Sequence, residues 1–139
     1  MDVDSALALC ARWLPTWTGN QPEALAAFYS EDCLYRDPGR PNGLRGRDEL
    51  LRYLGRLLTA NPAWRWAADE VIPTRDGFTL KWRAEIPIGD ETVVEHGLDI
   101  VEVDAAGLIA RNEVFFDRTA LFRALGAGDR VDESTSATR

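Results

Sequence analysis

The stretch "FTLKWRAEIPI", residues 78–88, alternates between apolar and polar side chains over most of its length. The apolar residues at every second position are Phe78, Leu80, Trp82, Ala84 and Ile86, and the polar residues between them are Thr79, Lys81, Arg83 and Glu85. Because successive side chains of a β-strand point to opposite faces, this alternation predicts a strand that buries one face and exposes the other.

Stretches with the same period of two lie on both sides of residues 78–88, and together they predict an antiparallel sheet. We expect its strands over the stretches "AWRWAADEVIPT" (63–74), "ETVVEHGLDIVEV" (91–103) and "LIARNEVFFD" (108–117). Polar turns separate these strands, so that consecutive strands are neighbours. A further short strand, "CLYRD" (33–37), is expected earlier in the chain, followed by a loop rich in Pro and Gly (38–46).

The first part of the chain has the period of helices instead. We expect helices over "SALALCARWLPTWTGN" (5–20), "GNQPEALAAFYSEDC" (19–33) and "GRDELLRYLGRLLTANP" (46–62), and a short final helix over "RTALFRALG" (118–126). Ser5 is a candidate cap of the first helix, and Phe28 and Tyr29 fall on the apolar face of the second. Helices followed by strands predict an α+β fold, a cone in which three N-terminal helices pack on a curved, mostly antiparallel sheet. The inside of such a cone is a natural pocket for a ligand.

The length and composition exclude several classes of protein. A chain of 139 residues predicts one domain, and 23 acidic against 16 basic side chains argue against nucleic acid as a partner. Two cysteines and a single histidine are too few for a disulfide framework or a Cys/His metal site. The sequence shows neither a signal-peptide pattern nor an apolar run long enough to cross a membrane. We therefore expect a cytoplasmic protein without a bound metal.

Three acids and one histidine are candidates for chemistry. Asp37 ends the expected strand 33–37, where initiation of a turn before Pro38 is the ordinary explanation. Asp99 falls between Gly97 and Val101 on one face of its strand, so it is either solvated or a partly buried acid with a raised pKa. Asp117 stands directly before the last helix, where it is a good N-cap.

The histidine, His96, is the only imidazole of the chain and could act as an acid or a base. A lone histidine on a strand is nevertheless more often structural or exposed. Aromatic side chains are the candidates for the wall of a pocket that takes an apolar or polycyclic small molecule. They are Trp13, Trp17, Phe28, Tyr35, Tyr53, Trp82 and Phe115.

Four stretches together resemble the SnoaL-like polyketide cyclases of the nuclear transport factor 2-like superfamily, and also ketosteroid isomerases and limonene epoxide hydrolases. They are "ALAAFYSEDCLYRDPG", "GLRGRDELLRYL", "HGLDIVEVDAAGLI" and "NEVFFDRTALFRALG". The resemblance implies one SnoaL-like domain over residues 1–126. Residues 127–139 are polar and short of large apolar side chains, so we expect them to form a flexible tail.

The resemblance also implies roles for the acids. In the isomerases, the acid that corresponds to Asp37 shuttles a proton at the α-carbon of the substrate. A second acid, which Asp99 matches, donates a hydrogen bond to the oxyanion. The isomerases also carry a tyrosine on the first helix, where this chain has Trp13. In the cyclases and epoxide hydrolases an acid ends the last long strand, and Asp117 matches it.

We therefore expect a cyclase or isomerase that abstracts a proton next to a carbonyl group without a cofactor. Two alternatives stay open: an epoxide hydrolase that uses Asp117, and a binding or dimerisation module without catalysis. The hydrolases also carry an Arg-x-Asp sequence on a middle strand, where the nearest stretch here is Arg83-Ala84-Glu85. Large apolar residues on both faces of 63–72 and 97–103 further predict a homodimer formed by the outer face of the sheet.

Overall fold

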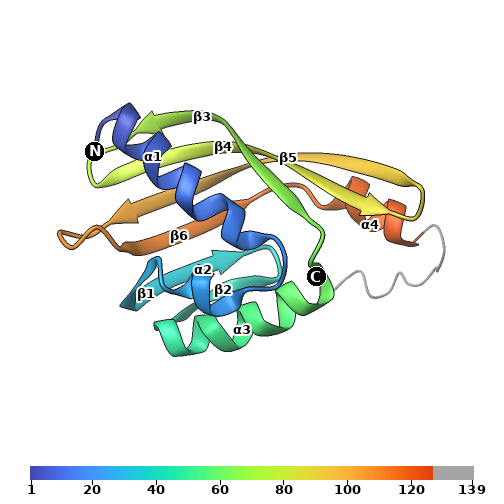
Figure 1. Ribbon diagram of the computed structural model, residues 1–139, viewed down its shortest axis with the longest axis horizontal. Coiled ribbons are helices and arrows are strands. Elements are labelled where there is room, and N and C mark those ends of the chain that lie inside the picture. The colour runs from blue at the N-terminus through green and yellow to red at the C-terminus, as the bar shows by residue number, and fades with distance from the viewer. Residues whose placement is uncertain (127–139) are drawn as a thin grey trace.

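A computed structural model describes residues 1–126, and they form one curved six-stranded sheet with helices (Figure 1). The helical elements are α1 (Val3–Trp13), the 3-10 helix η1 (Leu14–Trp17), α2 (Pro22–Ala26), α3 (Arg47–Ala60) and α4 (Thr119–Gly126). The strands are β1 (Tyr29–Asp37), β2 (Arg40–Arg45), β3 (Arg65–Pro73), β4 (Gly77–Ile88), β5 (Glu91–Val103) and β6 (Ile109–Phe115). The predicted α+β class is confirmed, and the predicted tail, residues 127–139, lies outside the described residues.

The strand order in the sheet is β2-β1-β6-β5-β4-β3. All neighbouring strands are antiparallel except β1 and β6, which pair in parallel. The meander predicted for the second half of the chain is therefore confirmed over β3 to β6. The parallel pair joins the first strand to the last, so that residues 29–37 lie beside residues 109–113.

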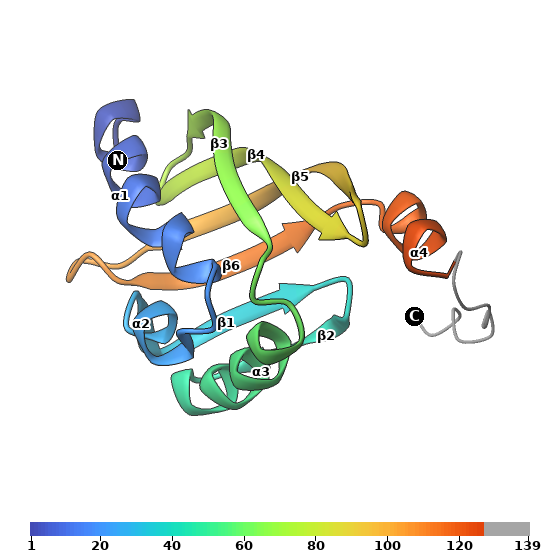
Figure 2. The same ribbon diagram turned by 45° about the vertical axis from the view of Figure 1, so that its right-hand side comes forward.

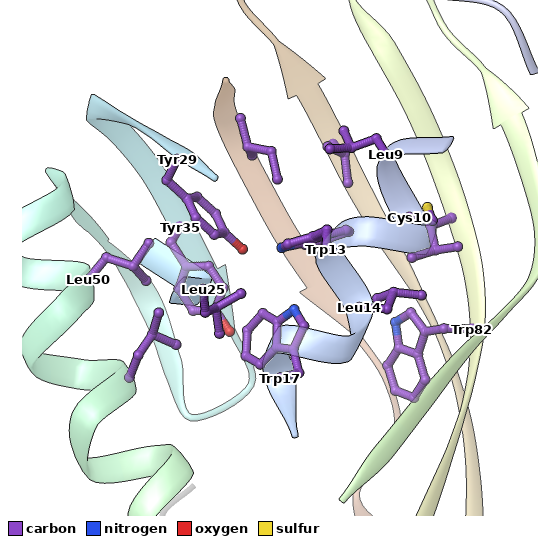
Figure 3. Close-up of a cluster of buried hydrophobic side chains, with 14 of the residues drawn as sticks. Leu9, Cys10, Trp13, Leu14, Trp17, Leu25, Tyr29, Tyr35, Leu50 and Trp82 are labelled. Atoms are coloured by element: carbon purple, nitrogen blue, oxygen red, sulfur yellow. The ribbon is translucent and has the colours of Figure 1, made fainter. Parts of the chain in front are cut away.

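The alternation in β4 buries one face of the strand and exposes the other, as predicted. Phe78, Leu80, Trp82, Ala84 and Ile86 are all buried, whereas Lys81 of the opposite face is exposed. Helices α1 and α3 lie on the same side of the sheet, α1 beside β3 and α3 beside β1 (Figure 2). Their apolar side chains meet those of the sheet in the core (Figure 3). Helix α4 lies beyond the end of β6, away from the turn between β5 and β6 (Figure 1).

Two predictions for the first half of the chain are wrong. The helix expected over 19–33 is only the short α2, because β1 begins already at Tyr29 and pairs with β6. Tyr29 therefore reaches the core from a strand. The loop expected over 38–46 contains β2, which forms a hairpin with β1. Pro41 is tolerated there because β2 is an edge strand, where one side of the backbone needs no partner.

The cap of the first helix also differs from the prediction. The side chain of Asp2, and not that of Ser5, caps α1 by accepting a hydrogen bond of 2.8 Å from the backbone N–H of Ser5. In the part of the chain that the structure describes, no helix is long and apolar enough to cross a membrane.

Candidate active site

A cavity of about 280 Å³ lies between η1, α3, α4 and the inner face of the sheet. Its wall is mostly aromatic and aliphatic, and a few polar side chains reach it. The aromatic residues in the wall are Trp17, Tyr35, Tyr53, Trp64, Trp66, Trp82, Phe116 and Phe122. Two carboxyl groups also line the cavity, those of Asp37 and Asp99, which come from strands far apart in the sequence. An apolar cavity with a few converging polar groups is the usual form of a small-molecule site.

Asp37 ends β1 and is held by four hydrogen bonds. Its Oδ1 accepts the backbone N–H groups of Gly39 (2.8 Å) and Arg40 (2.9 Å). Its Oδ2 accepts the hydroxyl groups of Tyr35 and Tyr53, both at 2.7 Å. The turn of the Asp-Pro-Gly sequence thus supplies two donors, and the tyrosines of β1 and α3 supply two more.

This arrangement fills all the acceptor positions of the Asp37 carboxylate, since two oxygens offer about four lone pairs. Burial raises the pKa of both tyrosines, and the negative charge of Asp37 raises it further. Tyr35 and Tyr53 therefore remain protonated donors near neutral pH. Before Asp37 can accept a proton from another molecule, one of these donors has to turn away.

Asp99 projects from β5 into the same cavity and is only 5% exposed. Its Oδ1 accepts the indole N–H of Trp82 at 2.8 Å, and its Oδ2 accepts the amide of Asn112 at 3.0 Å. Tyr29 completes the chain of hydrogen bonds by donating its hydroxyl to Oδ1 of Asn112 at 2.7 Å. Burial raises the pKa of Asp99 to about 7, although the bonds from Asn112 and Trp82 act in the opposite direction. A large fraction of Asp99 is therefore protonated near neutral pH.

Gly97 provides the space that Trp82 needs to reach Asp99. A Cβ atom at Gly97 would lie 2.2 Å from Cζ2 of the Trp82 ring and 2.8 Å from the backbone oxygen of Phe115. The indole therefore packs directly on the backbone of β5, two residues before Asp99. The sequence His-Gly-Leu-Asp places both the acid and the gap for its donor on the inner face of one strand.

The structure brings Asp37 and Asp99 together at one cavity but leaves the other two candidates outside it. Asp117 is exposed, and its Oδ1 accepts the N–H (2.9 Å) and the hydroxyl (2.6 Å) of Thr119 at the start of α4. These hydrogen bonds lower the pKa of Asp117. His96 lies on the outer face of the sheet, where its Nδ1 is 3.6 Å from Oδ2 of Asp69.

Four of the seven aromatic residues predicted for the cavity wall are found there: Trp17, Tyr35, Tyr53 and Trp82. The predictions for Trp13, Phe28 and Phe115 are corrected. Trp13 is fully buried in the core between Trp17 and Tyr29 (Figure 3). Phe28 precedes β1 and packs under the guanidinium group of Arg12.

The third correction follows from strand parity. Phe115 is paired with Leu98 on the outer face of the sheet, and its neighbours Val114 and Phe116 take the place in the wall. Two residues near Asp99 were also missed, namely Asn112, which donates a hydrogen bond to Asp99, and Tyr29, which donates one to Asn112. Asn112 lies two residues before Val114 and therefore on the same, inner face of β6. The alternation of the strand could have predicted that Asn112 points toward the cavity side of the sheet. Within residues 1–126 no group of three or more His, Cys, Asp or Glu side chains could hold a metal ion.

Comparison with known proteins agrees with this architecture. The sequence profile of the SnoaL-like domain matches residues 10–112. The chain belongs to the SnoaL-like domain family. A steroid Δ-isomerase of Nocardioides simplex is 28% identical over 109 residues, which cover 78% of this chain and 87% of that protein.

Solved structures show the same fold at low sequence identity. A protein from Mycobacterium tuberculosis has a TM-score of 0.70 at 16% identity, with 84% of this chain and 94% of that chain covered. A Catenulispora acidiphila protein with a ketosteroid isomerase-like fold, in complex with trimethylamine, has a TM-score of 0.67 at 16% identity. That match covers 78% of this SnoaL-like chain and 85% of the other.

Proposed function

We propose that this protein is a small-molecule isomerase or cyclase that transfers a proton at the carbon next to a carbonyl group of an apolar ligand. The observation that carries the proposal is the pair of carboxyl groups in one largely apolar cavity, each in a different hydrogen-bonding environment. The similarity to a steroid Δ-isomerase supports the same class of reaction.

The proposed reaction divides the work between the two acids. The protonated carboxyl group of Asp99 donates a hydrogen bond to the carbonyl oxygen of the ligand. The carboxylate of Asp37 takes the proton from the α-carbon, and the electron pair of the C–H bond passes into an enolate whose oxygen is stabilised by Asp99. An isomerase then returns the proton from Asp37 to another carbon. In a cyclase, the enolate carbon forms a bond with a second carbonyl carbon of the same ligand, the C=O π bond of that carbonyl opens, and its oxygen takes the proton from Asp37.

The environments of the two acids suit these roles. The indole of Trp82 and the amide of Asn112 are donors that hold both oxygens of Asp99 in place. A buried carboxyl group with a pKa of about 7 keeps a proton to donate at neutral pH. Asp37 becomes available as a base when Tyr53 turns away. We assign this movement to Tyr53 because it is only partly buried, whereas Tyr35 is 1% exposed.

The epoxide-hydrolase alternative has less support. It rests on Asp117, which caps α4 outside the cavity, and on the stretch Arg83–Glu85, whose two charged side chains pair with each other on the outer face of β4. A binding module without catalysis remains the competing function, and the test below separates the two.

The test is the exchange of α-protons of β-tetralone, a bicyclic ketone, in deuterium oxide, followed by NMR. We expect the protein to accelerate exchange, and Asp37→Asn to lower the rate by about 10²–10⁴-fold. Asp99→Asn should also lower it, whereas Asp90→Asn, in the exposed turn between β4 and β5, should leave it unchanged. Binding of the ketone with no exchange, or with exchange that survives Asp37→Asn, would favour the binding module.

A further inference from the structure

The opening of the cavity carries a guanidinium group. Arg118, which precedes α4, lines the cavity, and its guanidinium carbon lies 4.6 Å from the ring centroid of Phe122. A Cβ atom built on Gly39 would be 3.7 Å from Nη1 of Arg118 and 3.3 Å from the hydroxyl of Tyr53. Gly39 is exposed and also lines the cavity, so these residues mark the side on which the cavity opens to solvent.

Arg118 has no acidic partner among the described residues. The ion pairs within residues 1–126 involve other basic side chains. Asp37 lines the same cavity, but its four acceptor positions are filled by two tyrosine hydroxyl groups and two backbone N–H groups. The donors of the Arg118 guanidinium group are therefore directed to no protein acceptor in this part of the chain.

A second arginine, Arg40, lies near the cavity without lining it. The guanidinium carbon of Arg40 is 5.6 Å from the ring centroid of Tyr53. Burial and the charge of Asp37 raise the pKa of Tyr53, and both Arg40 and Arg118 act against that rise, which places both cations near its hydroxyl group. Both arginines thus lie near Tyr53, in a chain whose formal net charge is -7, and only Arg118 lines the cavity.

We propose that the ligand of this cavity carries a carboxylate group, which binds Arg118 at the opening while the apolar, carbonyl-containing part lies inside. The planar guanidinium group forms two parallel hydrogen bonds with a carboxylate, which gives orientation as well as affinity. Binding at the opening fixes which end of an elongated ligand enters toward Asp99. The proposal extends the function proposed above, and it uses the same cavity.

The test compares two probes of nearly equal shape, β-naphthylacetate and its uncharged amide β-naphthylacetamide, by isothermal titration calorimetry. We expect the protein to bind the acid at least about tenfold more tightly than the amide, which corresponds to about 1.4 kcal/mol. Arg118→Gln should abolish this preference and leave the affinity for the amide within about twofold. Arg118→Lys should keep part of the preference because it keeps the charge.

Arg123→Gln is the matched control, since Arg123 is exposed on α4 and does not line the cavity. It should retain the full preference for the acid. Equal affinity for the two probes, a preference that survives Arg118→Gln, equal weakening of both probes by Arg118→Gln, or no binding of either probe would overturn the proposal. The exchange experiment with β-tetralone reports separately on the carboxyl groups of Asp37 and Asp99. A preference for the acid without proton exchange would refute the enzymatic function and leave the carboxylate site intact.

Discussion

Replacing Asp99 by Asn should change how the stability of the protein depends on pH. In the folded protein burial raises the pKa of Asp99 from its ordinary value of 3.8 to about 7. Between these two values the folded state holds a proton that the unfolded state has lost. The free energy of unfolding therefore falls as the pH rises through this range.

The size of the effect follows from the pKa. Near pH 5 the free energy of unfolding falls by about 1.4 kcal/mol for each pH unit, and the slope is about half of that at pH 7, where Asp99 is half ionised. The wild type should therefore lose about 2 kcal/mol of stability from this group between about pH 5 and about pH 7. Asn cannot ionise, and the side chains around it can adapt. The amide of Asn112 can turn round so that its oxygen accepts the new NH₂ group, and the hydroxyl of Tyr29 then accepts the NH₂ of Asn112. The variant should therefore be more stable than the wild type above about pH 7 and lack this pH dependence.

The assay is unfolding by urea at several pH values between about 5 and 8, analysed as the difference in free energy between variant and wild type. Asp90→Asn serves as the control, because it makes the same chemical change in an exposed turn. If the curves of wild type and Asp99→Asn run parallel over this range, Asp99 does not titrate there. The argument for Asp99 as a proton donor at neutral pH would then be wrong.

Three further predictions concern other parts of the molecule. Gly97→Ala should displace Trp82, because the new Cβ would lie 2.2 Å from its ring. We expect it to lower the free energy of unfolding in chemical denaturation by about 1–3 kcal/mol and to slow proton exchange. An unchanged exchange rate would contradict the role of the indole. Asp117→Ala should lower the melting temperature by removing the cap of α4 and leave the exchange rate unchanged, whereas a large loss of rate would return Asp117 to the list of catalytic candidates. We also propose that the outer face of the sheet forms a homodimer, since Phe115 is 46% exposed there. Phe115→Asp should then halve the mass measured by light scattering. A wild-type protein that is already monomeric at micromolar concentration would refute the dimer.

Strand alternation made much of the site predictable from the sequence. The period of two in β5 placed Asp99 on the same face as Val101, and Tyr35 two residues before Asp37 shared its face. What alternation does not contain is the pairing of strands. Asn112 reaches Asp99 because it lies opposite Val101 in the pairing of β5 with β6. Val101 is two residues from Asp99 on the same face of β5, so the amide lies diagonally across from the carboxyl group.

Residues outside regular periodic stretches were harder to place. The edge strand β2 has Pro and Gly at positions that are typical of a loop, and only its pairing with β1 makes it a strand. Arg118 lies between β6 and α4, where no period indicates a direction for its side chain. Its position beside Gly39 depends on the parallel pairing of β1 with β6, the first and the last strand of the sheet in chain order.

The distribution of tryptophan gives this protein a built-in optical signal. Four of its five indole rings, Trp17, Trp64, Trp66 and Trp82, line the cavity, and Trp13 is fully buried apart from it. A ligand that enters must displace water from beside these rings or pack against them, so the intensity and wavelength of the intrinsic fluorescence should change with occupancy. Unlabelled protein can then be screened against collections of apolar carbonyl compounds, with Trp13 as the ring that a bound ligand does not reach.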